Sequence, residues 1–350
     1  MNLNDLINHT SEWLRSTGPN SDVVISSRIR LARNLDKVVF SHRATKKQAE
    51  STLNIIEQAI STVGYLKKSM IFHLNELDSV DRQFLVERHL MSLEFAKSSN
   101  SKAVVVDEQE IVVIMINEED HLRIQVMQSG FNLFEAFNII NQIDDALSKE
   151  LPFAFSPELG YLTACPTNTG TGMRGSSMLH LPALVMSGQI NRVLQAVAKL
   201  SFATRGLYGE GTQASGNFFQ ISNQVSLGHS EEEILQNLIG LIRQLIEQEQ
   251  QARQVLLTRN RSLLEDRIYR SEGILKSAHI ISSQETIELL SMLRLGVDLN
   301  LIKNIDRSTV NELFILTQPA HLQKIENKKL SAQERDLKRA ELVRKKLIKS

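Results

Sequence analysis

The sequence predicts an α+β protein, in which an antiparallel β-sheet flanked by helices precedes a C-terminal domain that is all-helical. Apolar β-branched segments alternate with segments of helical periodicity over the first two thirds of the chain. Two of these segments, residues 103–106 and 111–116, are separated only by a short acidic stretch, which predicts an antiparallel hairpin. No strand pattern follows Val225, and helical patterns fill the remainder. We therefore expect a domain over residues 1–257 and a helical domain over residues 258–350.

The N-terminal part of the chain is predicted to form a short helix and then a strand that carries two arginines. Residues 1–17 are predicted as a short helix that ends before Gly18-Pro19. Residues 23–31 alternate in the manner of a strand, and the period of two places Arg28 and Arg30 on the same face. The alternative is an edge strand whose charges are merely solvated.

The remaining elements follow from the same periodicities. Helices are predicted over residues 45–66, 80–95, 133–147, 183–200 and 231–257, with strands at 70–74, 121–128 and 218–225 in addition to the hairpin. Helix starts are indicated by Ser/Thr–Glu capping boxes at Ser230/Glu233, Ser282/Glu285, Thr309/Glu312 and Ser331/Glu334.

The composition is that of a soluble globular protein, with 42% apolar and 23% charged residues among 350. The formal net charge is zero, so no whole-protein field favours nucleic acid or a membrane, although residues 321–350 carry ten Lys/Arg against four Asp/Glu. A single cysteine excludes an internal disulfide and a cysteine-based metal cluster. Neither a signal peptide nor a membrane-spanning apolar run is evident, so a cytoplasmic protein is expected.

The most unusual stretch is the loop over residues 164–175, Ala-Cys-Pro-Thr-Asn-Thr-Gly-Thr-Gly-Met-Arg-Gly, which contains the cysteine and three glycines. No Asp or Glu occurs between Leu159 and Gly209, a stretch that suits a polyanion and holds four cations, Arg174, Arg192, Lys199 and Arg205. The loop matches G-x-G-x-x-G, but a dinucleotide site also needs an acidic residue about 20 positions later, which is absent. No Lys follows the glycines, so a P-loop is excluded and arginines must supply the positive charge.

A second unusual stretch is the acidic sequence Asn-Glu-Glu-Asp-His-Leu-Arg over residues 117–123, directly after an apolar strand. Strand alternation would send Glu118 and Glu119 to opposite faces, so that one of them points into a site. The alternative is an ordinary strand-end turn. His121 is expected to be a structural hydrogen-bonding residue, because no second histidine lies at metal-ligand spacing.

Together these stretches indicate a site for a nucleoside triphosphate. Arginines bind phosphates through bidentate, charge-assisted hydrogen bonds, and nearby carboxylates can hold and deprotonate an acceptor. The candidate residues lie at strand ends or in glycine-rich loops: Arg28, Arg30, Arg123, Arg174, Arg205, Glu119, Glu210 and Cys165.

Four motifs in this order resemble those of the phosphagen kinases, which phosphorylate guanidino groups. They are S-S-R-x-R at residues 26–30, N-E-E-D-H-L-R at 117–123, C-P-[ST]-N-x-G-T-G-x-R at 165–174, and R-G-x-x-G at 205–209 leading to Ser222-Asn223. The resemblance covers residues 20–257 and implies a glutamine-synthetase-like antiparallel fold that uses ATP with Mg²⁺, without a metal cage of its own.

The resemblance also implies roles for individual residues. It assigns phosphate binding to Arg28, Arg30, Arg123, Arg174 and Arg205. It makes Glu119 the catalytic carboxylate, Glu210 a second carboxylate that clamps the guanidinium, and Cys165 a thiolate beside that group. One departure is Ser226, which stands where relatives have a further nucleotide-binding arginine.

The ends of the chain are similar to one branch of this family, the bacterial protein arginine kinases. Small-molecule phosphagen kinases carry a helical domain before S-S-R-x-R, whereas only 25 residues precede Ser26 here and a helical domain follows instead. Residues 335–340 match R-D-x-x-R-A, which implies a regulatory phosphoarginine-binding site at Arg335, Asp336 and Arg339. The alternative for these residues is a solvated basic helix face.

This resemblance implies ATP-dependent phosphorylation of arginine side chains in proteins, which marks them for a Clp protease and serves stress regulation. The implied partners are proteins with exposed arginines, among them a transcriptional repressor, together with an activator protein and the Clp protease. A homodimer is expected, with no membrane and no direct nucleic-acid contact. Two alternatives stay open, a kinase for free arginine or another small guanidine and a phosphoarginine-binding adaptor. A nucleic-acid binder would need aromatic residues among the basic ones, which are absent from the basic tail.

Overall fold

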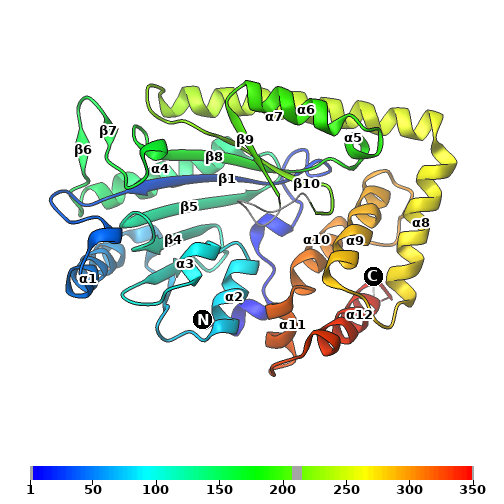
Figure 1. The fold of residues 1–350 in the computed structure, drawn as a ribbon, viewed down its shortest axis with the longest axis horizontal. Helices are drawn as coiled ribbons and strands as arrows, with labels where there is room; N and C mark the ends of the chain where they lie inside the picture. Colours follow the sequence, from blue (N-terminus) through cyan, green and yellow to red (C-terminus); the bar gives the residue numbers. More distant parts are fainter. Residues whose placement is uncertain (1–2, 207–214, 349–350) are drawn as a thin grey trace.

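An eight-stranded antiparallel sheet forms the centre of the computed structural model, which describes residues 3–206 and 215–348 (Figure 1). The strand order is β2-β3-β4-β5-β1-β8-β10-β9. The strands are β1 (Val24–Arg33), β2 (Met70–His73), β3 (Ala103–Val106), β4 (Val112–Ile116), β5 (Leu122–Ser129), β8 (Met173–His180), β9 (Phe202–Arg205) and β10 (Phe218–Asn223). A separate ribbon consists of β6 (Phe155–Ser156) and β7 (Gly160–Tyr161). The predicted antiparallel sheet and its hairpin β3–β4 are confirmed.

Strand β1 is a central strand, so the alternative of a solvated edge strand is wrong. It pairs with β5 on one side and with β8 on the other. Its odd-numbered residues Ile29 and Leu31 are fully buried, whereas Arg28 and Arg30 project from the opposite face. The period of two therefore gives β1 one apolar and one cationic face, as predicted.

The apolar face of the sheet is covered by long helices. Helix α4 (Leu133–Ser148) contacts β1 and β5, and α7 (Glu231–Arg259) contacts β8 and β10. Helix α1 (Lys46–Thr62) adds its apolar residues to the same core. Gly175 of β8 allows α7 to come close, since a Cβ atom there would lie 2.9 Å from Leu238 Cδ2.

The other face is only partly covered. Helices α2 (Ser79–Glu87) and α3 (Leu93–Ala96) pack on β2, β3 and β4, where they form a second, smaller apolar core. This core includes Phe84 of α2, Phe95 of α3 and Met115 of β4. The part of this face formed by β5, β1, β8, β10 and β9 carries polar and cationic side chains instead.

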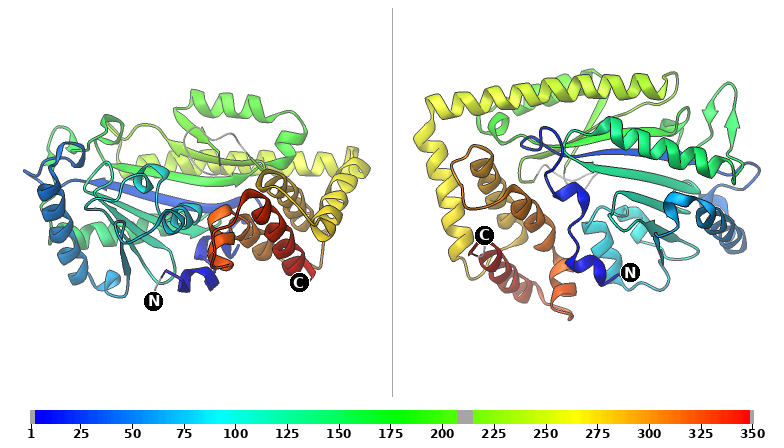
Figure 2. Two further views of the ribbon diagram at one scale, coloured as in Figure 1. Left: turned by 60° about the horizontal axis from the view of Figure 1, so that its bottom comes forward. Right: turned by 180° about the vertical axis from the view of Figure 1, so that it is seen from behind.

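Five helices follow α7 and lie beside one end of the sheet (Figures 1 and 2). They are α8 (Arg261–Ser277), α9 (Ser283–Asp298), α10 (Arg307–Leu316), α11 (Pro319–Ile325) and α12 (Ala332–Ile348). No strand follows β10 in the described part of the chain, which confirms the all-helical C-terminal region. Two short helices, α5 (Pro182–Met186) and α6 (Ile190–Lys199), lie between β8 and β9.

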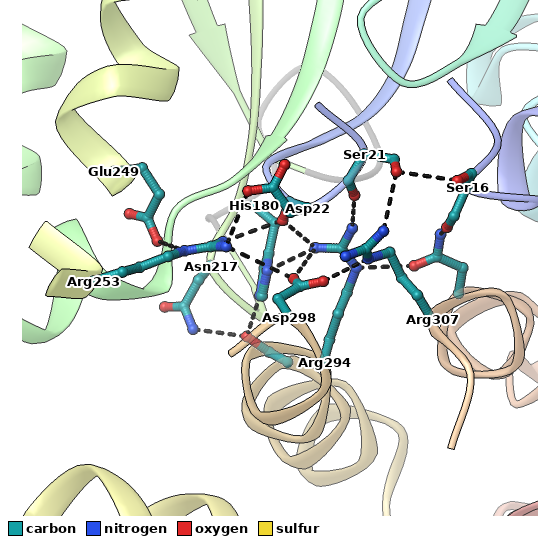
Figure 3. A network of polar contacts seen from close by, with 12 residues as sticks. Ser16, Ser21, Asp22, His180, Asn217, Glu249, Arg253, Arg294, Asp298 and Arg307 are labelled. Carbon is teal, nitrogen blue, oxygen red and sulfur yellow. Dashed lines mark hydrogen bonds and ion pairs between the residues drawn. The ribbon is translucent and has the colours of Figure 1, made fainter. Parts of the chain in front are cut away.

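A buried polar network joins these helices to the sheet (Figure 3). Arg294 of α9 is fully buried and donates from Nη2 to Ser21 O and from Nη1 to His180 Nδ1, at 2.5 and 3.0 Å. His180 ends β8, and its Nε2 lies 2.9 Å from Ser291 Oγ. Because its Nδ1 accepts from Arg294, His180 is the Nε2–H tautomer, and burial, followed by the charges of Arg294 and Arg253, lowers its pKa and keeps it neutral.

Asp298 supplies the negative charge of this network. Its carboxylate lies 2.5 Å from Arg307 Nε, 3.3 Å from Arg294 Nη1 and 3.9 Å from Arg253 Nη1. We expect Asp298→Asn to lower the free energy of unfolding by about 3–5 kcal/mol, because it leaves buried cations without a counter-charge. Urea denaturation measures the change.

The exposed pair of Asp266 and Arg270 on α8 provides the control. Asp266→Asn removes the same charge where water screens it, so a loss of about 0–1 kcal/mol is expected. Equal losses in the two variants would contradict a stabilising role for Asp298.

Several predicted elements differ from those observed. The predicted N-terminal helix is replaced by two 3-10 turns, η1 (Asp5–Asn8) and η2 (Glu12–Leu14). The predicted helix over residues 80–95 is two helices, α2 and α3, and that over 183–200 is also two, α5 and α6. The second break comes at Gly188, whose φ of 72° a helix does not accommodate. Strands β8 and β9 were not predicted at all.

The predicted capping boxes give a mixed result. Ser230/Glu233 and Ser331/Glu334 form reciprocal hydrogen bonds, and Ser282 Oγ accepts from Glu285 N–H. The prediction for Thr309 is wrong, because α10 begins at Arg307 and its N-cap residue is Asp306.

Candidate active site

The five predicted arginines lie on the same face of the sheet, although they come from four strands. Arg30 of β1 stands opposite Arg174 of β8 on one side and opposite Gln125 of β5 on the other. Arg123 is two residues from Gln125 and therefore projects from the same face. Two-residue periodicity in three adjacent strands thus gathers three arginines in a row across the sheet.

Arg28 and Arg205 complete the set further along the sheet. Arg28 Nη2 donates to Gln220 Oε1 of β10 at 2.8 Å, and Gln220 stands opposite Arg205 of β9. Gln220 therefore links the two arginines across the edge of the sheet. It was not among the predicted site residues, although alternation along β10 could have placed it on this face.

A cavity of about 1010 Å³ lies between this face and helices α2 and α3. Its floor includes Arg28, Arg30, Arg123 and Arg205, while α2, α3 and the segment between α3 and β3 supply the opposite wall. Arg174 does not line the cavity itself; it neighbours Arg30 across the sheet, and its Nε lies 3.3 Å from Asn223 O.

The arginine cluster is electrostatically unfavourable by itself. Burial lowers the pKa of Arg28 to about 9, and the charges of Arg123, Arg174 and Arg205 add to the shift. Burial also lowers the pKa of Arg30 well below its usual value, again reinforced by the neighbouring arginines. Arg30 is 8% exposed, and its buried Nε has no hydrogen-bond partner among the described residues. A bound anion would offset both the repulsion and the missing hydrogen bond.

Two carboxylates border the arginines, and the structure assigns them different environments. Strand β4 ends at Ile116, and residues 117–121 form a turn that starts with Asn117 at a φ of 59°. The predicted alternation of Glu118 and Glu119 is therefore wrong, and both line the cavity. The alternative of a strand-end turn describes the backbone correctly.

Glu118 is tied down by two partners. Both of its carboxylate oxygens lie 2.7 Å from Arg123 Nη1, and Oε1 also accepts from Ser92 Oγ at 2.6 Å. Burial alone would raise the pKa of Glu118, but Arg123 and these hydrogen bonds lower it to about 2. Glu119 is exposed and lies at the rim of the cavity.

The cysteine loop is fastened to this acidic turn. Asp120 accepts hydrogen bonds from Ala164 N–H at 2.7 Å and from Asn34 Nδ2 at 2.6 Å. Cys165 is half-buried with its Sγ 3.1 Å from Thr167 Oγ1, and it is not among the residues that line the cavity. The prediction for His121 is confirmed, since its Nδ1 accepts from Leu35 N–H at 3.0 Å.

Ser226 has a structural part in the same loop. Its hydroxyl group lies 3.2 Å from Thr167 O and 3.0 Å from Thr169 O, and the residue is buried. Gly170 packs against the same segment, because a Cβ atom there would lie 2.8 Å from Ser226 O. Ser226 thus fixes the shape of the glycine-rich loop, whereas the sequence identified it only as a missing arginine.

The other predicted site residues lie apart from the cavity or outside the described residues. Glu210 belongs to the latter group, since residues 207–214 are not described. Arg339 of α12 is 2% exposed and donates to Thr317 O at 2.8 Å, Ile281 O at 3.0 Å and Asp336 Oδ1 at 2.5 Å. The alternative of a solvated face is therefore wrong for Arg339. Arg335 is only partly buried and donates to Leu330 O at 2.8 Å.

A small cavity of about 20 Å³ adjoins the main one. Both are lined by Arg28, His89 and Gln220, and the small cavity also by Trp13, Met127 and Met178. Burial, followed by the charge of Arg28, lowers the pKa of His89 to about 3, so its ring is neutral. The buried Nε1 of Trp13 has no acceptor among the described residues.

Across residues 3–206 and 215–348, no cluster of three or more His, Cys, Asp or Glu side chains is arranged to hold a metal ion. In the same residues, no helix combines the length and apolar character that crossing a membrane requires.

Comparisons with known proteins identify relatives over the whole chain. The family described as ATP:guanido phosphotransferase, C-terminal catalytic domain, matches residues 51–252, and the protein-arginine kinase McsB C-terminal domain matches residues 261–350. The protein-arginine kinase of Halothermothrix orenii is 47% identical over 99% of both chains. That of Symbiobacterium thermophilum is 48% identical, also over 99% of both chains.

Solved structures with a similar fold include a lombricine kinase and a taurocyamine kinase. A lombricine kinase has a TM-score of 0.59 and 26% identity, covering 66% of this chain and 67% of its own. The duplicated taurocyamine kinase of Schistosoma mansoni with bound transition-state analogue components has a TM-score of 0.60 and 24% identity. It covers 79% of this chain and 41% of its own, and at this identity the likeness concerns the fold alone.

Proposed function

The chain belongs to the protein-arginine kinases of the ATP:guanido phosphotransferase family, and we propose that it transfers the γ-phosphoryl group of ATP to arginine side chains of proteins. The observation that supports this most strongly is the cluster of five arginines on one sheet face, four of which line a cavity that has two carboxylates at its edge. Such a cluster is repulsive unless an anion occupies it.

The nucleotide would bind along the arginine-bearing strands. The five arginines Arg28, Arg30, Arg123, Arg174 and Arg205 would hold the phosphates. The Nε of Arg30 has a hydrogen bond to donate to them. The adenine ring of ATP would enter beside Met127 and Met178, whose flexible side chains can move to widen the small cavity. Mg²⁺ enters with ATP as part of the substrate and neutralises charge on the phosphate oxygens.

Glu119, rather than Glu118, would accept the proton of the acceptor guanidinium. A carboxylate with a pKa of about 2 is a weak base, and Glu118 is already engaged by Arg123. As the proton passes to Glu119, the guanidine nitrogen bonds to the γ-phosphorus, and the bond from that phosphorus to the bridging oxygen of ADP breaks. Glu210 as a second clamp and Cys165 as a thiolate beside the guanidinium are parts of the proposal that rest on the family resemblance.

A protein acceptor agrees with the exposure of Glu119 at the cavity rim, where an arginine on another protein can reach it. The test is incubation of the chain with ATP and either an arginine-rich protein or free arginine, followed by mass spectrometry at neutral pH. Phosphoarginine on the protein is expected. Phosphorylation of free arginine alone would favour the small-guanidine alternative. Targeting to a Clp protease, regulation of a repressor, an activator and a homodimer also belong to this proposal and rest on the resemblance.

We further propose that residues 1–257 form the catalytic domain and that residues 258–350 bind phosphoarginine through Arg335, Asp336 and Arg339. In the structure Arg339 already fastens α12 to the carbonyl groups of Thr317 and Ile281. Arg335 is more accessible, so it would be the principal donor to the phosphoryl group, while Asp336 would receive the guanidinium half.

The two arginines can therefore be separated by mutation. Arg335→Ala should abolish phosphoarginine binding and leave the free energy of unfolding within about 0.5 kcal/mol. Arg339→Ala should lower that free energy by about 1–3 kcal/mol, because buried carbonyl groups lose their donor. Calorimetry with free phosphoarginine and chemical denaturation measure the two effects. Undiminished binding by the Arg335 variant would contradict the assignment.

A further inference from the structure

The wall of the cavity that faces the sheet carries a second set of cations. Arg82 of α2, Lys97 after α3 and Lys102 before β3 all line the cavity opposite the arginine-bearing strands. Both Arg82 and Lys102 are partly buried. The cavity is therefore cationic on two sides, and not only on the face proposed for the triphosphate.

Two of these cations lack a carboxylate partner in the part of the chain that the structure describes. Lys97 Nζ pairs with Glu94 at 2.5 Å, as Arg123 does with Glu118. Among the described residues, Arg82 donates to the carbonyl oxygens of Asp78 and Ala96. Lys102 Nζ lies 5.0 Å from the centre of the Phe95 ring. Neither Arg82 nor Lys102 forms an ion pair with a carboxylate of residues 3–206 or 215–348. Arg82 and Lys102 therefore add positive charge to the cavity beyond that of the arginines proposed to bind ATP.

Lys102 lies near the turn that carries Glu119, where the acceptor arginine is proposed to bind. Asn117, the first residue of the acidic turn, donates from Nδ2 to Ser101 O at 2.8 Å. Burial lowers the pKa of Lys102, while the nearby Glu118 and Glu94 oppose that shift. Lys102 thus lies next to the turn that carries Glu118 and Glu119.

Helix α11 holds α2, which forms part of this wall, in place. Glu87 accepts hydrogen bonds from the backbone N–H groups of Ala320 and His321 at the start of α11, at 2.9 and 3.0 Å. Asp81 pairs with Lys324 of α11 at 2.7 Å. Arg82 is therefore carried by a helix fixed at both ends, as a preorganised binding group requires.

We propose that Arg82 and Lys102 bind a carboxylate of the protein substrate that neighbours the acceptor arginine, so that the enzyme favours arginines flanked by Asp or Glu. This inference rests on the proposed function. An arginine on a protein surface commonly pairs with an acidic neighbour, which would hold its guanidinium away from Glu119. Cations beside the acceptor site can take over that carboxylate and release the guanidinium for transfer.

The test uses two peptides with a single arginine, flanked on both sides by Glu in one and by Gln in the other. For the full chain with ATP, kcat/KM is expected to be roughly tenfold higher for the Glu peptide, the size of one charge-assisted hydrogen bond. The preference should shrink as salt is added. Equal kcat/KM values for the two peptides would overturn the proposal without any variant.

Variants of Arg82 and Lys102 then show whether these two residues cause the preference for the Glu peptide. Lys102→Met and Arg82→Gln should each reduce the ratio, mainly through the KM of the Glu peptide, whereas Lys102→Arg should restore it. Lys97→Met is the matched control and should keep the ratio, since Lys97 already pairs with Glu94. An equal rise of the KM for ATP with both peptides would instead assign the wall to the nucleotide. Absence of phosphoarginine on both peptides would contradict the proposed function itself.

Discussion

Replacement of Arg30 by Met is expected to slow phosphoryl transfer by roughly 10³–10⁵-fold while making the folded protein more stable. The loss follows because an arginine aimed at the transferring group stabilises charge that develops in the transition state. The gain follows because Arg30 is buried among like charges and lacks a partner for Nε. Methionine has a similar length without the charge, so it fills the space and removes the repulsion.

The sign of the stability change follows from the direction of the pKa shift. The pKa of Arg30 is lower in the folded protein than in the unfolded chain, so folding with a charged arginine is disfavoured at every pH where the unfolded arginine is protonated. Near neutral pH the variant should therefore gain about 1–3 kcal/mol in the free energy of unfolding, measured without nucleotide. Added ATP should stabilise the unmodified chain more than the variant.

The control is Arg192→Met in the same acid-free stretch. Arg192 is exposed on α6, so its replacement should change neither the transfer rate nor, beyond about 0.5 kcal/mol, the stability. A destabilised Arg30 variant would show that the arginine contributes to the fold and would contradict an anion site at this position.

How far the sequence predicts this fold depends on which residues carry each strand. Strand β1 and the β3–β4 hairpin are rich in Val, Ile and Leu, and their patterns predict them correctly. Strand β8 is as central as β1, yet its sequence Met-Arg-Gly-Ser-Ser-Met-Leu-His has no β-branched residue. Pairing on both sides with β1 and β10, and not local propensity, makes it a strand.

In the candidate site too, residues whose position depends on long-range packing could not be predicted from local sequence. Motifs locate the five arginines and Glu119, and the structure brings the arginines onto one face. Arg82 and Lys102 have no local signal, because only the packing of α2 against the sheet turns ordinary surface cations into a cavity wall. The burial of Arg339 was missed for a related reason, since its acceptors Thr317 and Ile281 are distant in sequence.

Glu119→Gln is expected to reduce the rate of phosphoryl transfer by about 10²–10⁴-fold, the contribution of a general base. Glutamine keeps the size and hydrogen-bonding capacity of the side chain but cannot accept the proton. Affinity for ATP should stay within about twofold, because the proposed phosphate-binding groups are the arginines of the sheet. The measurements are single-turnover kinetics for the rate and calorimetry for ATP.

Glu118→Gln is the informative comparison, because it removes the neighbouring carboxylate in the same turn. Glu118 is ionised throughout the neutral range, given its pKa of about 2, and its partner is Arg123. Its replacement should leave Arg123 without its partner, and so lower both the affinity for ATP and the rate of transfer. Glu119→Gln, by comparison, should lower the rate alone. If Glu119→Gln retains near-normal turnover while Glu118→Gln loses the rate and keeps ATP affinity, the roles proposed for the two glutamates must be exchanged.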